Sequence, residues 1–153
     1  MEDGPKVNAW VIDGETLHPL NNQPADGGLP CHITVDKTGK FVLSANYETG
    51  SIVCYPIREN GSLGKTRTLI QHQGSGSCHP RQLGPHAHAV VLSADNRLLF
   101  VPDLGLDKIL VYQFNEETGD LTPSDPAFVK THTGAGPRHF VFHPSNRYRI
   151  CAE

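Results

Sequence analysis

Three residues that could perform acid–base and anion-binding chemistry occur at matching positions of a repeated segment. His88 and Arg138 each begin a 16-residue segment, and Glu153 ends one. An imidazole transfers protons near neutral pH, a carboxylate can act as a base, and a guanidinium binds oxyanions through paired N–H groups. Together these groups could activate water, bind an anionic substrate and stabilise a developing oxyanion.

The repeated segment occurs three times, at 31–46, 88–103 and 138–153, and the three copies align without a gap. Their first residues are 57 and 50 positions apart. Each copy contains an apolar run, a turn rich in Asp, Asn, Pro or Gly, and a second apolar run, which is the pattern of a β-hairpin. The turns are expected at 36–39, 93–96 and 143–146.

Two further strands are predicted after each of the first two hairpins. The third strands are expected at 51–57 and 108–114, the polar loops at 58–64 and 115–123, and the fourth strands at 66–71 and 127–130. Near the start of the chain, a third strand is predicted at 7–13 and a fourth at 17–22. Four antiparallel strands in about 50 residues are typical of one blade of a β-propeller.

We therefore predict an all-β chain that forms an incomplete β-propeller of about three blades, each a four-stranded antiparallel sheet. The end of one blade is expected at 1–29, whole blades at 30–84 and 85–136, and the first hairpin of the next blade at 137–153. Closed propellers usually have about 4–8 blades. We expect the chain to be a truncated piece, or one whose ring an oligomer completes.

The hairpin geometry places the chemistry-bearing residues at one end of the blades. The first and last positions of an antiparallel hairpin lie side by side, and the first strand of a propeller blade is normally innermost. The residues expected around one mouth of the central channel are therefore Cys31, Asn46, His88, Asp103, Arg138 and Glu153. Arg81, Gln82, His86 and His139 flank the same rim and are candidate substrate-binding residues, as is Asp103.

Composition argues against several other classes of protein. The net charge is −3, with 13 Lys and Arg against 16 Asp and Glu, so the basic excess of a nucleic-acid-binding protein is missing. No apolar run approaches the roughly 20 residues of a membrane span, and the first ten residues lack the pattern of a secretory signal. We predict neither nucleic acid nor membrane as a partner.

Metal and redox chemistry have little support in the sequence. His86 and His88 are spaced to share one side of a strand, but no third ligand is fixed by spacing, so we predict no metal site. Four cysteines occur without a C-x-x-C pair, which favours free thiols in a reducing cytoplasm. They are Cys31, Cys54, Cys78 and Cys151.

Several segments resemble the lactonase family of seven-bladed propellers, which includes bacterial-type 6-phosphogluconolactonases and fungal carboxy-muconate lactonizing enzymes. The segments are ANYETGSI (45–52), RQLGPHAHAV (81–90), PDLGLDKILVY (102–112), GAGPRHFVFHP (134–144) and the closing AE (152–153). The resemblance extends from about Val7 onward. It matches His88, Arg138 and Glu153 with a histidine, an arginine and a glutamate of the family, and it implies no chemical role for 103–107. A further family arginine lies in the next blade, beyond residue 153.

The resemblance implies hydrolysis of a sugar lactone, with 6-phosphogluconolactone converted to 6-phosphogluconate in the oxidative pentose phosphate pathway. The protein would then be a cytoplasmic hydrolase that needs no cofactor and acts on a small anionic lactone. Glu153 would act as base toward water or orient another base, Arg138 would bind an anionic group or the oxyanion, and His88 would transfer protons or donate a hydrogen bond. The alternatives are a muconate-type lactone cyclase or isomerase and a non-catalytic, protein-binding propeller.

The same residues also have structural interpretations. His88 could be a hydrogen-bonding residue of the channel wall, and Arg138 could form an ordinary salt bridge with Glu153. Asp103 could cap the turn made by the two residues that follow it, and we favour that interpretation over a ligand role. Asn46 is likewise more typical of a turn.

Overall fold

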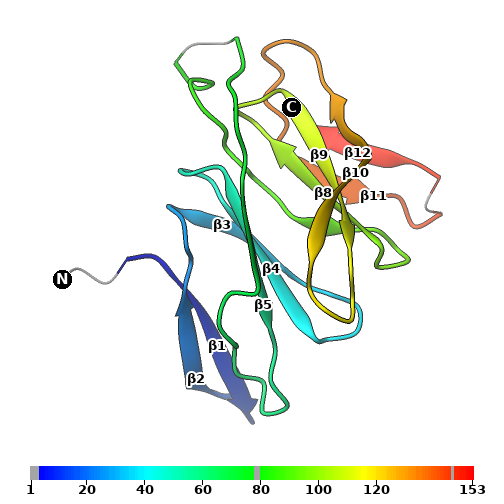
Figure 1. The fold of residues 1–153 in the computed structure, drawn as a ribbon. Coiled ribbons are helices and arrows are strands. Elements are labelled where there is room, and N and C mark those ends of the chain that lie inside the picture. The colour runs from blue at the N-terminus through cyan, green and yellow to red at the C-terminus, as the bar shows by residue number, and fades with distance from the viewer. Residues whose placement is uncertain (1–3, 78–79, 146) are drawn as a thin grey trace.

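The structure, a computed structural model, describes residues 4–77, 80–145 and 147–153, and all regular structure in these ranges is β-strand (Figure 1). Cys78 and Asn146, which belong to the predicted set of cysteines and to the third predicted turn, lie outside the described residues. The strands are β1 (Lys6–Asp13), β2 (Thr16–Pro24), β3 (Pro30–Val35), β4 (Phe41–Asn46), β5 (Ser51–Pro56), β6 (Thr68–Gln71), β7 (Val91–Leu92), β8 (Leu98–Asp103), β9 (Lys108–Phe114), β10 (Leu121–Lys130), β11 (His139–Phe142) and β12 (Arg149–Ala152).

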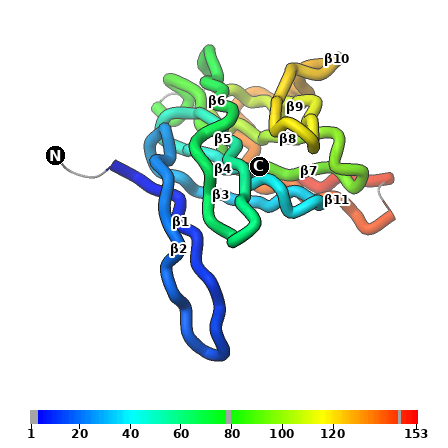
Figure 2. The backbone as a smooth tube through the Cα atoms, turned by 60° about the horizontal axis from the view of Figure 1, so that its bottom comes forward, coloured from blue at the N-terminus to red at the C-terminus, as the bar shows by residue number. Residues whose placement is uncertain are grey.

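The strands form four separate antiparallel sheets in chain order. Two sheets have four strands each, β3-β4-β5-β6 and β7-β8-β9-β10, and in both every strand pairs with its neighbour in sequence. Two-stranded sheets, β1-β2 and β11-β12, lie on either side of this pair (Figures 1 and 2). A four-stranded antiparallel meander is the blade of a β-propeller, so the predicted fold class is confirmed.

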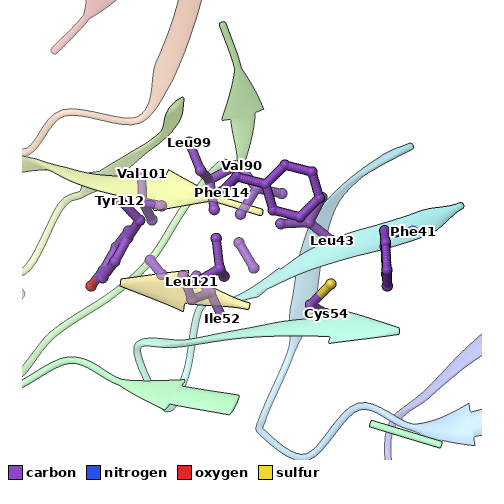
Figure 3. Packing of buried hydrophobic residues seen from close by; sticks show 12 residues of the cluster. Phe41, Leu43, Ile52, Cys54, Val90, Leu99, Val101, Tyr112, Phe114 and Leu121 are labelled. Atoms are coloured by element: carbon purple, nitrogen blue, oxygen red, sulfur yellow. The ribbon is translucent and has the colours of Figure 1, made fainter. Parts of the chain in front are cut away.

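The main apolar core lies between the two four-stranded sheets. Figure 3 shows Leu43 and Ile52 of the first sheet facing Leu99, Val101 and the rings of the second. Two smaller apolar clusters pack the flanking two-stranded sheets against the four-stranded sheets. The second cluster contains Val7, Val42, Val53, Tyr55 and Leu63, and the third contains Phe100, Ile109, Val111 and Phe140. Each pair of neighbouring sheets therefore buries one shared apolar layer, as stacked propeller blades do.

The turns of the first two hairpins also connect the neighbouring four-stranded sheets. The Asp36 carboxylate accepts the backbone N–H groups of Thr38 and Phe41, which closes the β3–β4 turn. The Asn96 amide nitrogen donates to the same carboxylate at 3.0 Å, and the Lys37 N–H donates to the Asn96 side-chain oxygen. Asn96 has a φ of 63°, a conformation that Asn tolerates better than most residues. These bonds fix the two hairpins at the end opposite the predicted rim.

Two strands differ from the prediction. β7 has only two residues, whereas the repeat predicted a strand from residue 88 onward. The rim part of that segment still follows β8, because Ala87 bridges Asp103 and the His88 N–H donates to the Pro102 carbonyl. β10 begins at Leu121, inside the predicted loop at 115–123, and its register shifts between Pro123 and Phe128.

Candidate active site at the rim

The structure brings the starts of the three repeats to the same end of their hairpins, with the pairing of the first two offset by one residue from the prediction. Pro30 pairs with Asn46 in the first hairpin, Ala87 bridges Asp103 in the second, and the Arg138 N–H donates to the Ala152 carbonyl in the third. The rim is therefore the end of the sheets at which the first segments of the three repeats start. Each of these segments is held there by pairing with the second strand of its own hairpin.

Three histidines and a tyrosine form a contiguous ring cluster at this rim. The His86 ring stacks on Tyr47 with centroids 4.7 Å apart, and the His88 ring meets the same tyrosine edge-on at 5.5 Å. His88 also contacts His139, with centroids 5.3 Å apart. The His86 Nδ1 lies 2.8 Å from the Tyr47 carbonyl, which fixes the stacked ring. Predicted site residues of two neighbouring sheets thus meet at His88, which also contacts Tyr47 of a third sheet's hairpin.

Burial, together with neighbouring basic side chains, favours the neutral form of His88. Burial lowers the pKa of His88 below its ordinary value of 6.5, and its own backbone hydrogen bond only partly offsets this effect. The nearby positive charges lower the pKa further, and they belong to His139, Arg138 and His32. Near neutral pH the imidazole is therefore uncharged, and it can both accept a proton and donate a hydrogen bond.

His32 and Tyr47 belong to this cluster but were not among the predicted site residues. The His32 Nδ1 accepts the Val90 N–H at 3.3 Å, and burial, together with the charge of His139, lowers the pKa of His32. The repeat alignment could have indicated His32, because it occupies the same position as His139. Tyr47 carries a weaker signal, since it follows the last position of the first repeat.

Cys31 connects two neighbouring innermost segments. Its thiol lies 3.5 Å from the Ala87 carbonyl and 3.4 Å from the His88 carbonyl, as well as 3.6 Å from the Ala45 carbonyl of its own hairpin. Burial raises the pKa of the Cys31 thiol, which keeps it protonated and weakly nucleophilic. Cys31 therefore holds His88 in place at the rim.

Arg138 and Glu153 do not form the salt bridge that one interpretation expected. In the described part of the chain, the ion pairs are Lys40–Glu117, Arg67–Asp120 and the buried pair of His72 with Asp103. Within those same ranges, no hydrogen bond joins Glu153 to His88 or Arg138. Glu153 is exposed beside Cys151, whose pKa is raised by burial and by the Glu153 charge.

Asp103 is completely enclosed, which corrects the expectation that it binds substrate. Its side chain is 0% exposed. One oxygen accepts the N–H groups of His86, Gly105 and Leu106, and the other lies 2.7 Å from the His72 Nδ1. No carboxylate oxygen is left for a ligand. Asp103 instead caps the β8–β9 turn, as the alternative interpretation held, and it also fixes the backbone of His86.

Asp107 performs a similar role on the other side of the same turn. Its carboxylate accepts the N–H groups of Gly134 and Gly136 and the Gln82 side-chain amide, at 2.7, 2.9 and 2.6 Å. Burial alone would raise the pKa of Asp107, but these donors and the charge of Lys130 together lower it below the ordinary 3.8. Gln82, itself buried, also donates to the Leu104 carbonyl. Its position is thus fixed from two directions.

A small cavity lies beside the ring cluster. It has a volume of about 170 Å³, and Arg81 and Arg138 both line it. The remaining wall residues are Gln82, Leu104, Gly134, Ala135 and Gly136. Six of the predicted residues therefore form two adjoining groups: His86, His88 and His139 lie in the ring cluster, and Arg81, Gln82 and Arg138 line the cavity. The two groups meet where Arg138 precedes His139.

The described residues contain no group of three or more His, Cys, Asp or Glu side chains arranged to hold a metal ion. In these same ranges, no helix is long and apolar enough to cross a membrane. Cys31, Cys54 and Cys151 are free thiols. The imidazole, guanidinium and carboxylate groups at the rim can transfer protons and bind anions.

The four-stranded antiparallel meanders stack side by side, which is the architecture of a piece of a β-propeller. The histidines lie together at one rim of this piece. Residues 2–152 match the family described as lactonase, 7-bladed beta-propeller, and the chain belongs to that family. It is 39% identical over 144 residues to the 6-phosphogluconolactonase of Bacillus subtilis strain 168, and 40% identical over 147 residues to that of Klebsiella pneumoniae strain 342. These alignments cover 93% and 96% of this chain, but only 40% and 38% of the relatives.

Solved structures show the same relationship. The periplasmic gluconolactonase of Pseudomonas aeruginosa superimposes with a TM-score of 0.91 at 33% identity, covering 96% of this chain and 42% of that one. A Lactobacillus plantarum protein gives a TM-score of 0.89 at 38% identity, covering 99% and 43%. The chain thus spans about two fifths of the length of the proteins it matches.

Proposed function

We propose that the protein containing this chain hydrolyses a sugar lactone, converting 6-phosphogluconolactone to 6-phosphogluconate in the oxidative pentose phosphate pathway. The observation that carries the proposal is the convergence of His88, His139 and Arg138 on one rim. Membership of the lactonase family and the curated relatives named 6-phosphogluconolactonase support the choice of reaction and substrate. A protein-binding propeller would not require such a set of titratable groups and would more often present exposed aromatic anchors.

The reaction requires one bond to form, one to break and one proton to move. The oxygen of water attacks the lactone carbonyl, the bond from that carbon to the ring oxygen breaks, and a proton passes from the water to the ring oxygen. Neutral His88 can accept the proton and release it to the leaving oxygen. Arg138 stabilises the oxyanion formed during the attack. Glu153 either takes the proton of the water itself or orients the base that does.

The test is hydrolysis of freshly made 6-phosphogluconolactone by the natural protein that contains this sequence, corrected for spontaneous ring opening. We expect His88→Ala and Glu153→Gln each to lower kcat by roughly 10²- to 10⁴-fold, the usual contribution of a general acid or base. Unchanged rates in both variants would contradict the assigned roles. A well-folded protein that does not accelerate hydrolysis would contradict the proposed function itself.

We also infer that the protein acts in the cytoplasm. The three described cysteines are all free, and free thiols are typical of proteins kept in a reducing compartment. A phosphorylated, charged lactone would also have to be hydrolysed where it is made, because it cannot cross an apolar bilayer unaided. Fractionation of the source cells, with detection of the protein by antibody, tests this: recovery outside the cytoplasmic fraction would contradict it.

A further inference from the structure

Arg81 and Arg138 line the same small cavity although they are 57 positions apart in sequence. Arg81 lies in the long connection before β7, and Arg138 lies immediately before β11. The cavity, at about 170 Å³, is smaller than the roughly 300–1,000 Å³ of a pocket that encloses a whole small-molecule ligand. It is large enough for one compact group of a ligand whose remainder lies outside.

Both guanidinium groups are available to a ligand. In the described part of the chain, neither side chain takes part in a hydrogen bond or an ion pair. Among the described residues, the carboxylate that bonds to the wall of the cavity is that of Asp107, which is 4% exposed and accepts three N–H donors. Its charge is thereby compensated from within the protein. Two unpaired arginines facing one cavity are an arrangement that favours a bound anion.

We propose that this cavity binds the phosphate group of a phosphorylated sugar lactone and that Arg81 determines the preference for phosphorylated over unphosphorylated substrates. The inference rests on the proposed lactonase function. A guanidinium binds phosphate through two parallel N–H···O bonds, and a phosphate monoester has enough oxygens for two such groups. Arg138 also borders the ring cluster through His139, so it lies between the bound phosphate and the reacting carbonyl.

The position of the cavity agrees with the shape of such a substrate. In a 6-phosphorylated 1,5-lactone, the carbonyl carbon and the carbon that carries the phosphorylated CH2 arm flank the ring oxygen, so the phosphate lies at the end of an arm several bonds from the reactive carbonyl. The structure likewise separates the arginine-lined cavity from the cluster of His86, His88 and Tyr47, and joins the two through Arg138 and His139. A phosphate held by Arg81 would direct the lactone ring toward His88.

Asp107 is the positioning residue for this cavity. It holds Gln82, the neighbour of Arg81, and it also holds the Gly134–Gly136 loop that leads to Arg138. One carboxylate therefore connects both walls and limits the separation of the two arginines. This role explains why the charged Asp107 is buried next to a proposed anion site. Holding both walls requires an acceptor that can bind several N–H groups at once, and a carboxylate has enough lone pairs to do so.

The experiment compares two substrates in the natural protein that contains this sequence: 6-phosphogluconolactone and glucono-1,5-lactone, which lacks the phosphate. We expect Arg81→Ala to raise KM for the phosphorylated lactone by about 10- to 100-fold, the usual effect of losing charge-assisted hydrogen bonds. The kcat/KM for glucono-1,5-lactone should change less than about twofold. Arg81→Lys keeps the charge but not the planar fork, so it should lie between wild type and alanine.

Arg97→Ala is the matched control, because it removes one positive charge at the exposed β7–β8 turn, far along the hairpin from the rim. It should leave both substrates unaffected. Equal losses on the two substrates in Arg81→Ala, or no loss on either, would overturn the phosphate assignment while leaving lactone hydrolysis intact. If the wild-type protein hydrolyses neither lactone, the proposed function fails. Calorimetric binding of 6-phosphogluconate against gluconate then still tests the cavity: equal affinity for the two would overturn it.

Discussion

His88 illustrates how a few neighbouring groups set the chemistry of one side chain. Burial and the electrostatic effect of His139, Arg138 and His32 favour its neutral form, while the Cys31 thiol and the Pro102 carbonyl contact its backbone. A neutral imidazole at the rim can take a proton from water, whereas a protonated one cannot. The permanent charge of Arg138 therefore serves two purposes, since it attracts an anionic substrate and also favours the neutral form of the proposed base.

The first prediction concerns the titration of His88. Since its pKa is lowered below 6.5, protonation requires a more acidic solution than for a free histidine, and the acid limb of the kcat/KM profile should fall below pH 6.5. His139→Gln removes one positive neighbour, so the His88 pKa should rise part of the way back while burial keeps it below 6.5. NMR titration of the His88 ring measures this change directly, and the acid limb should move in the same direction.

His18→Gln is the control for that titration, because His18 is exposed on β2 and makes no contact with the rim cluster. It should leave the His88 titration unchanged. If His139→Gln lowered the His88 pKa, or left it at the wild-type value, the electrostatic account of the cluster would be wrong.

The sequence predicts some of these residues and misses others for identifiable reasons. His88, His139 and Arg138 follow from the repeat, because equivalent positions of successive hairpins meet at one rim. His72 could not be predicted, since it lies after β6 and reaches Asp103 only when two sheets are packed together. Tyr47 could not be predicted for the same reason. Its contacts with two histidines depend on how neighbouring sheets are placed, and a local sequence pattern contains no information on that placement.

Among the elements, the β8–β9 turn has the largest effect on the site. Asp103 at its start holds the backbone of His86, and Asp107 at its end holds Gln82 and the Gly134–Gly136 loop. Both aspartates accept backbone N–H groups from segments that lie outside the strands: Asp103 from His86, and Asp107 from Gly134 and Gly136. The turn therefore determines the positions of both groups of rim residues, although it contributes no side chain to the proposed chemistry.

The second prediction follows from this role of Asp107. Asp107→Ala leaves the N–H groups of Gly134 and Gly136 and the Gln82 amide without their acceptor, which we expect to cost about 3 kcal/mol of unfolding free energy in urea denaturation. Asp107→Asn keeps one acceptor oxygen and should cost less. Asp13→Ala, which removes an exposed carboxylate at the end of β1, is the control and should change stability by about 0.5 kcal/mol or less.

The same substitution has a predictable dependence on pH. The folded-state pKa of Asp107 is lowered below 3.8, so its stabilising effect is fully present above that pH and is lost as the pH falls through the folded pKa. The stability difference between wild type and Asp107→Ala should therefore be constant near neutral pH and should shrink in acid below 3.8. A difference that grew on acidification would contradict the hydrogen-bonded carboxylate.

The strands themselves could be predicted to different degrees. β4, β5, β8 and β9 have apolar runs because they are buried between sheets, and their positions agree with the sequence pattern to within a residue. β10 was placed too late because most of it is exposed, so its first residues have the polar composition of a loop. β7 was placed too early, because His88 and its neighbours bond to a thiol and a histidine from the adjacent sheet in addition to β8.

At the scale of the whole molecule, neighbouring four-stranded sheets are joined at both ends and along their length. The Asn96–Asp36 hydrogen bond connects the hairpin turns, and the Cys31 thiol connects the rim. Between these two ends lies the shared apolar core (Figure 3). The period of the repeat predicts that such units exist and are alike. It cannot predict which face of one unit packs on which face of the next, because that depends on side-chain shapes in both.

The last prediction tests whether this shared core stabilises the arrangement of the sheets. Leu43 is 0% exposed between the two four-stranded sheets, whereas Leu69 on β6 is 51% exposed. Leu43→Ala creates a cavity and should lower the unfolding free energy by about 2–5 kcal/mol, while Leu69→Ala, the same chemical change, should cost less than about 1 kcal/mol because much of its side chain already contacts water. Urea denaturation followed by circular dichroism measures both. Equal costs would mean that the sheets do not depend on their shared core, and that the hydrogen bonds at the turns and at the rim determine how the blades stack.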